Sequence, residues 1–263
     1  MSNSTPTVNS LFNSARDEGI LSGQSLKALN VPDIGVAIQA ALGVPAIDVS
    51  SSEVFLVTLL VDDSSSIRFA GNSQIVRDGV NMVIDSLVGS KQKDTVLICI
   101  RYLNGEVICP FVPLSQAVKL TTQNYNPNGG TPLYDETAVS LGAVLAKTQE
   151  FRDQGQPVHS ASLVITDGRD EGSNRQTENS VSHIVRDLLR QEIHIVAAMG
   201  IDDGQTDFRQ IFSQMGFEDK WILTPSNTQT EIRRALGTFS QSAVRASQGA
   251  ASFSKTALGG FTV

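Results

Sequence analysis

Continuous apolar runs alternate along this chain with segments whose apolar residues recur every three to four positions. The run at 53–61 (EVFLVTLLV) is rich in β-branched residues and shows no polar alternation, which is typical of a strand covered by helices on both faces. Residues 73–87 place their apolar side chains on one helical face, with Asn72 or Ser73 available as the N-cap. We predict a central strand followed by a helix that packs back onto the sheet.

The next two apolar runs predict a β-hairpin. Residues 95–103 (TVLICIRYL) and 106–112 (EVICPFV) are joined by Asn104-Gly105, a dipeptide that favours a two-residue turn. Pro110 cannot donate a backbone hydrogen bond to a neighbouring strand, so the second strand is expected at the edge of the sheet. An antiparallel edge strand is therefore predicted.

The hairpin register also predicts the state of the two cysteines of the chain. If Asn104-Gly105 is a two-residue turn, Ile100 faces Cys109 and Cys99 faces Pro110. Side chains of neighbouring positions then point to opposite faces of the sheet. We expect both thiols to be free.

The strand and helix pattern then repeats to the end of the chain. A long helix is predicted at 133–151, with Leu133, Ala138, Leu141, Val144 and Leu145 on its buried side. Further elements are expected in the order strand 162–166, helix 177–191, strand 193–199, helix 206–215, strand 221–223 and helix 230–244. This alternation predicts an α/β fold with a doubly wound, mostly parallel six-stranded sheet and one antiparallel edge strand.

Composition sets the domain organisation and limits the partners. With 263 residues, 40% of them apolar, the chain suits one α/β domain at 53–244, with a small N-terminal helical appendage at 1–52 and a Ser/Ala/Gly-rich tail at 245–263. A net charge of −7 opposes nonspecific binding to nucleic acid. No apolar run is long enough to cross a membrane, and the N-terminus lacks a secretory pattern. We expect a cytoplasmic protein that binds neither nucleic acid nor membrane.

Polar motifs follow the predicted strands where doubly wound sheets bind ligands. Asp62-Asp63-Ser64-Ser65-Ser66 follows the first strand, Asp167-Gly168 follows the fourth, and Gly129-Gly130-Thr131 precedes the long helix. Together these motifs, D-x-S-x-S, G-G-T-P and T-D-G, resemble the von Willebrand factor A domain and its metal-ion-dependent adhesion site. The resemblance covers about residues 53–240 and extends to the element order. It suits an intracellular prokaryotic member of that family.

The resemblance implies a metal site. Its ligands would be Asp62, Ser64, Ser66, Thr131 and Asp167. The serines would bind the metal directly, the threonine directly or through water, and the aspartates often through water. Two carboxylates and three hydroxyls form an all-oxygen donor set, which suits Mg²⁺, Mn²⁺ or Ca²⁺ better than zinc. Mg²⁺ is the expected ion.

Other acidic residues near these motifs are given different roles. Asp63 is expected to be an exposed neighbour, and Asp135 and Glu136 to complement the N-terminus of the long helix. Asp170 and Glu171 are expected to influence the choice of partner.

Binding is the predicted function. The resemblance implies that a carboxylate from a partner protein completes the metal site, and that the protein is an adaptor working with an ATPase, kinase or stress-response system. The sequence lacks a phosphate-binding P-loop, a G-x-G-x-x-G fingerprint and a G-x-S-x-G elbow. A D-x-D phosphatase motif is broken by Ser64. The alternatives are a structural subunit of a larger assembly and a metal-dependent phosphohydrolase.

Overall fold

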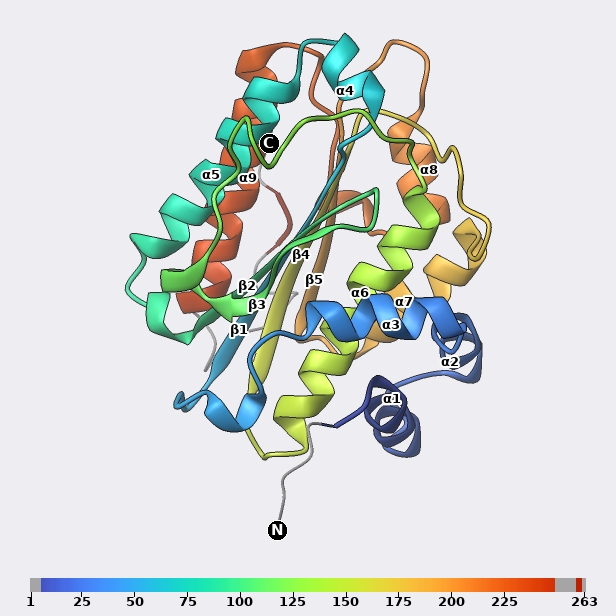
Figure 1. The fold of residues 1–263 in the computed structure, drawn as a ribbon, viewed down its shortest axis with the longest axis vertical. Coiled ribbons are helices and arrows are strands. Elements are labelled where there is room, and N and C mark those ends of the chain that lie inside the picture. Colours follow the sequence, from blue (N-terminus) through green and yellow to red (C-terminus); the bar gives the residue numbers. More distant parts are fainter. Residues whose placement is uncertain (1–5, 249–258, 262–263) are drawn as a thin grey trace.

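A six-stranded sheet forms the centre of the molecule (Figure 1). The computed structural model describes residues 6–248 and 259–261. The strands are β1 (Val54–Val61), β2 (Val96–Tyr102), β3 (Val107–Pro113), β4 (Val158–Thr166), β5 (His194–Gly200) and β6 (Ile222–Leu223). Their spatial order is β3-β2-β1-β4-β5-β6, with β3 antiparallel and the others parallel. The predicted fold class is confirmed, including the edge strand that contains Pro110.

Helices cover both faces of the sheet (Figure 1). One face carries α5 (Ser73–Val88) and α9 (Gln229–Gln248), and the other carries α6 (Leu133–Arg152), α7 (Glu178–Arg190) and α8 (Phe208–Gln214). Side chains of β1 alternate between the two apolar clusters. Val54, Leu56 and Leu60 join the α6 side, whereas Phe55, Val57, Leu59 and Val61 join the α5 side. This two-sided burial explains the unbroken apolar run.

Two element boundaries differ from expectation by four residues, and one helix was not expected. β4 begins at Val158, four residues before its predicted start at 162, and α9 continues past 244 to Gln248. A short helix, α4 (Ser65–Phe69), was not expected. The predicted tail falls largely on residues outside the described part of the chain. Its described portion includes Phe261, whose ring packs edge-on against Trp221 with a centroid distance of 5.1 Å.

The N-terminal segment forms helices α1 (Val8–Asp17), α2 (Gly23–Leu29) and α3 (Pro32–Ala41), which pack on α6 and α7. Their apolar residues belong to the same cluster as the α6 face of the sheet. Polar contacts add to this packing. The Ser22 amide donates to Asp187 Oδ2 at 2.7 Å, and Gln176 Nε2 donates to the Ala28 carbonyl at 2.9 Å.

This packing overturns the expectation that α6 has a single buried side. Both sides of α6 are buried because β1 and β4 contact one side and α1 and α3 cover the other. Charged residues on the covered side are therefore paired: Lys147 Nζ lies 2.8 Å from Glu150 Oε2. Lys147 also donates to the Val44 carbonyl, and Glu150 Oε1 accepts from the Ala46 amide at 2.9 Å. The sequence pattern could not show this, because the cover comes from a distant segment.

Helix length and composition also bear on membrane crossing. Within the described residues, no single helix is both long and apolar enough to span a bilayer. A sharply bent pair, Gly23–Leu29 with Asp33–Asp48, meets the length and composition criteria only when both helices are counted together.

The hairpin turn differs from the prediction. The Gly105 amide donates to the Tyr102 carbonyl at 3.1 Å, so the turn spans residues 102–105 and Gly105 ends it with a φ of 92°. Ile100 pairs with Cys109 as expected, but irregularities on both sides of Ile100 shift the neighbouring pairs. A two-residue turn at Asn104-Gly105 was therefore wrong. The thiols still lie in opposite apolar clusters and are free.

Burial predicts that these thiols are unreactive in the folded protein. Removal from water raises the pKa of Cys99 to about 12 and also raises the pKa of Cys109, and only the thiolate reacts readily. Iodoacetamide at pH 8 should modify neither cysteine in native protein and both in denaturant, as read by intact mass. Rapid native labelling, or a mass two hydrogens lower, would contradict this assignment.

Candidate metal centre

The centre lies where β1 and β4 end side by side. The two strands are parallel, with Val61 paired to Ile165, so the residues that follow them emerge at the same edge of the sheet. Asp62 follows β1 and Asp167 follows β4, and the Asp62 amide donates to the Ile165 carbonyl at 3.0 Å. The strand register therefore brings the two predicted carboxylates together.

Asp62 organises the loop after β1 from a buried position. Its Oδ1 accepts from the Ser64 amide at 2.7 Å, and its Oδ2 accepts from Thr166 Oγ1 at 2.6 Å and the Asp167 amide at 3.4 Å. Burial raises the pKa of Asp62, although these hydrogen bonds act in the opposite direction. Both carboxylate oxygens of Asp62 accept hydrogen bonds from the chain itself. Asp62 therefore orients the loop after β1 from a buried position.

The serine hydroxyls and Asp167 form the centre of the site. Ser64 Oγ lies 2.8 Å from Ser66 Oγ, which donates to Asp167 Oδ1 at 2.6 Å. Neighbouring ligands of an octahedral Mg²⁺ with bond lengths of about 2.1 Å lie about 3 Å apart. The two separations are those of hydrogen bonds and are about 0.2 and 0.4 Å shorter than such an octahedral edge.

Thr131 reaches the same point from the loop before α6. That loop is fixed on both sides: the Gly129 carbonyl accepts from the Ser65 amide at 3.0 Å, and Thr131 forms a β-bridge with Glu171. A Cβ placed at Gly168 would lie 3.6 Å from Thr131 Oγ1 and 3.9 Å from Ser66 Oγ. Glycine at this position keeps the space between the two hydroxyls open.

These contacts meet the requirements for a hard cation. The structure brings together all five residues predicted as metal ligands, and their donor atoms are all oxygens: Asp62, Ser64, Ser66, Thr131 and Asp167. Within residues 6–248 and 259–261, no three His, Cys, Asp or Glu side chains gather into a metal-binding cluster. A cation at this point would therefore need the hydroxyls as ligands. Metal binding itself remains a prediction.

Asp63 is not the exposed neighbour that we expected. Its side chain is buried, and its Oδ1 accepts from the Asn104 amide at 3.0 Å. Its carbonyl accepts from the amides of Asn128 and Gly129. Asp63 therefore joins the hairpin and the 128–131 loop to the loop after β1. Burial raises its pKa to about 6, and the nearby Asp62 charge contributes.

Asp135 and Glu136 lie in the first turn of α6, where negative charge complements the helix N-terminus as expected. Their side chains also make contacts outside the helix that were not expected: Asp135 accepts from amides at 174–176, and Glu136 pairs with Arg101 at 2.6 Å. The cap comes from the loop after β4, because Asp170 Oδ1 accepts from the Tyr134 amide at 3.1 Å. Asp170 is thus a structural group, while Glu171 is exposed beside the site.

Tyr125 is a further contributor that the sequence analysis missed. Its buried hydroxyl donates to the Asp62 carbonyl at 2.6 Å, and its ring lies 5.4 Å from that of Tyr102. Tyr125 lies in the polar segment NYNPNGG. An aromatic residue within such a segment was the available signal.

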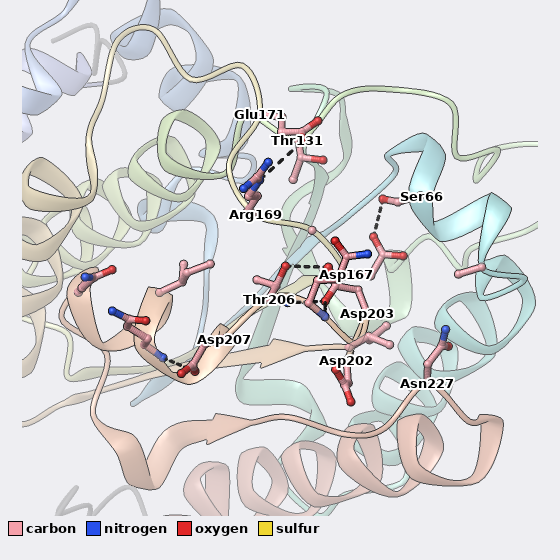
Figure 2. Close-up of a pocket in the computed structure, with 17 residues that line it drawn as sticks. Ser66, Thr131, Asp167, Arg169, Glu171, Asp202, Asp203, Thr206, Asp207 and Asn227 are labelled. Carbon is pink, nitrogen blue, oxygen red and sulfur yellow. Dashed lines mark hydrogen bonds and ion pairs between the residues drawn. The ribbon is translucent and has the colours of Figure 1, made fainter.

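A cleft of about 690 Å³ opens from the centre (Figure 2). Ser66, Thr131 and Asp167 lie on its wall, and the loop between β5 and α8 supplies Asp202, Asp203 and Asp207. Glu171 adds another carboxylate and Arg169 is the one basic residue among the lining side chains described. The centre is therefore open to solvent through an acidic cleft.

The strand order and the strand directions decide the fold. The chain has a von Willebrand factor A fold. No family model matches the sequence, and no curated protein matches it. Among solved structures it is similar to the pilus adhesin SpaC from Lactobacillus rhamnosus GG, with 15% identity and a TM-score of 0.53 over 73% of this chain. It spans 30% of that adhesin chain.

Two other solved structures are similar at lower scores. Proximal thread matrix protein 1 from the mussel byssus has 14% identity and a TM-score of 0.48, over 74% of this chain and 47% of the other. Manganese-loaded TRAP protein from Plasmodium vivax has 19% identity and a TM-score of 0.45, over 72% and 74%. At 15% identity, the similarity to the adhesin shows a shared fold alone.

The raised carboxyl pKa values predict that metal binding depends on pH. Burial raises the pKa of Asp167 to about 6, so below that pH a proton competes with the cation. In metal-free protein the folded pKa exceeds the unfolded value, and stability from this group falls as pH rises from about 4 to 6. Magnesium should therefore raise the melting temperature much more at pH 7.5 than at pH 5. An equal rise at both pH values would show that Asp167 is not involved.

Proposed function

We propose that this protein is a divalent-metal-dependent protein-interaction module whose metal site captures a carboxylate of a partner protein. The observation that supports the proposal most directly is the set of three oxygens, Ser64 Oγ, Ser66 Oγ and Asp167 Oδ1, with separations of 2.8 and 2.6 Å. Ser66 and Asp167 line an open cleft. The chain supplies ligands on one side, and the cleft leaves the other side accessible.

Each side chain has a distinct role in holding the cation. Ser64 and Ser66 bind it through neutral hydroxyls, and Thr131 contributes a third hydroxyl from the opposite loop. Asp167 adds a charge beside Ser66, whereas Asp62 orients the loop through its bonds to Ser64 and Thr166. When bound, the cation supplies an electrophilic position for an anionic oxygen ligand. Mg²⁺ is the expected ion, with Mn²⁺ or Ca²⁺ as alternatives.

Binding is favoured over turnover by what surrounds the centre. The described residues that line the cleft include no histidine, cysteine or lysine, so carboxylates are the only general bases beside the cation among them. The lining carboxylates repel phosphate esters. A metal-dependent phosphohydrolase remains the alternative that the experiments below test.

The cleft also limits what can carry the partner carboxylate. Five lining residues are acidic (Asp167, Glu171, Asp202, Asp203 and Asp207) against a single arginine. A highly acidic segment would be repelled along these walls, whereas basic side chains beside the coordinating carboxylate would be attracted. The partner is therefore expected to present one acidic residue within a basic surface. The predicted ATPase or kinase system remains untested.

Magnesium should stabilise the folded protein by mass action. A cation at about one hundred times its dissociation constant contributes about 2.7 kcal/mol, which corresponds to a rise in melting temperature of roughly 5–10 °C for a chain of this size. Asp62→Ala should remove this response, and Asp78→Ala, on an exposed face of α5, should retain it. A flat melting temperature across the magnesium titration in wild type would refute the metal site.

Capture of partner proteins should require the bound metal ion. In pull-downs with 1–263, proteins that bind in magnesium but not in chelator should be lost with Ser64→Ala and with Thr131→Ala. Both variants should stay folded, because these side chains lie in loops above the sheet. Capture unaffected by chelator would contradict the binding mode. Metal-dependent phosphatase turnover that disappears with Asp62→Asn would favour the hydrolase.

A further inference from the structure

Backbone hydrogen bonds join the loop before α6, which carries Thr131, to the loop after β4, which begins at Asp167. The Thr131 amide donates to the Glu171 carbonyl at 3.3 Å, and the Glu171 amide donates back to the Thr131 carbonyl at 2.8 Å. The first turn of α6 continues this contact: the Asp135 amide donates to Ser173 Oγ at 3.0 Å. Pro132, at the N-cap position of α6, makes no side-chain cap bond. Helix α6 therefore depends on the loop after β4 for its cap.

The Asp135 side chain makes a second contact between α6 and the loop after β4. Its carboxylate is buried and accepts from three successive backbone amides, at 3.1 Å from Asn174, 3.1 Å from Arg175 and 2.7 Å from Gln176. Arg175 Nε adds an ion pair at 3.1 Å. One side chain of α6 thus fixes the backbone of the loop that begins at Asp167. Hydrogen bonds from charged groups are the stronger kind.

Charged side chains extend these contacts from α6 to the hairpin turn. Arg175 Nη2 lies 3.2 Å from Glu136 Oε1, and Glu136 Oε2 lies 2.6 Å from Arg101 Nη2. Arg101 also donates to the Gly105 carbonyl at 3.3 Å, in the hairpin turn whose Asn104 amide bonds to Asp63. The network therefore links α6, the loop after β4 and the hairpin.

We propose that Asp135 is a positioning residue that sets the separation of Thr131 and Asp167, and so the affinity of the site for its cation. This inference rests on the proposed function. Thr131 lies four residues before Asp135, and the loop that Asp135 holds begins with Asp167. Without Asp135 the two ligands must be brought together when the cation binds. Groups that orient metal ligands typically change metal affinity by roughly 10–100-fold when removed.

A second buried carboxylate on α6 provides a matched control. Glu150 is also buried and also accepts from a cation and a backbone amide, those of Lys147 and Ala46. It lies 15 residues after Asp135, about 22 Å along the helix at 1.5 Å per residue. Glu150→Gln should therefore destabilise the fold without changing the metal site.

The test measures magnesium affinity of the full chain by calorimetry at pH 7.5 for wild type, Asp135→Asn and Glu150→Gln. Asp135→Asn should bind magnesium at least tenfold more weakly, and Glu150→Gln within twofold of wild type. Hydrogen exchange in metal-free protein should be faster at residues 174–176 in Asp135→Asn alone. If Asp135→Asn does not fold, Asp135→Glu, which keeps the charge but moves the carboxylate away from the amides at 174–176, should weaken binding severalfold.

The outcomes separate this inference from the proposed function. Magnesium binding that is equal in wild type and Asp135→Asn, or in wild type and Asp135→Glu where that variant replaces it, overturns the positioning role and leaves the proposed function intact. Equal weakening in Glu150→Gln also overturns it, because general loss of stability would then explain the effect. Absence of binding in wild type overturns both.

Discussion

Two buried carboxylates at the ends of adjacent parallel strands impose the main physical constraint on this structure. Asp62 and Asp167 are 0% and 5% exposed, and the contacts described for them are hydroxyls and amides, with no basic side chain among them. Burying charge without a counter-charge is costly. The raised pKa values of both groups express that cost. A divalent cation would remove it, which is why the arrangement favours a metal site.

The rest of the fold holds those carboxylates in place. Covered on both faces, the sheet fixes the strand ends, and the loops above it are joined by contacts through Asp63, Tyr125 and Asp135. Helix α6 contributes at both of its ends. Its first turn meets the loop after β4, and its later turns are buried under α1 and α3, where Lys147 pairs with Glu150. The N-terminal helices therefore stabilise the element that carries the Thr131 loop.

The sequence predicted much of this architecture because its strongest signals are local. The run at 53–61 identified a strand buried on both faces, and Pro110 identified an edge strand. The candidate metal ligands could be predicted because the short polar motifs directly follow the predicted strands. The contacts of Asp63, Asp135 and Tyr125 were not predicted, since their partners lie 38 to 63 residues away. Loops that fold against one another leave no periodic pattern in the sequence.

The most direct test of the account is a crystal structure of the protein grown in magnesium. Density is expected for one ion within about 2.1 Å of the Ser64 and Ser66 hydroxyls, with Thr131 and Asp167 beside it and an outward position filled by water or a carboxylate. An ion bound elsewhere, or a well-ordered site in which Ser66 still donates to Asp167 and no ion is present, would contradict it.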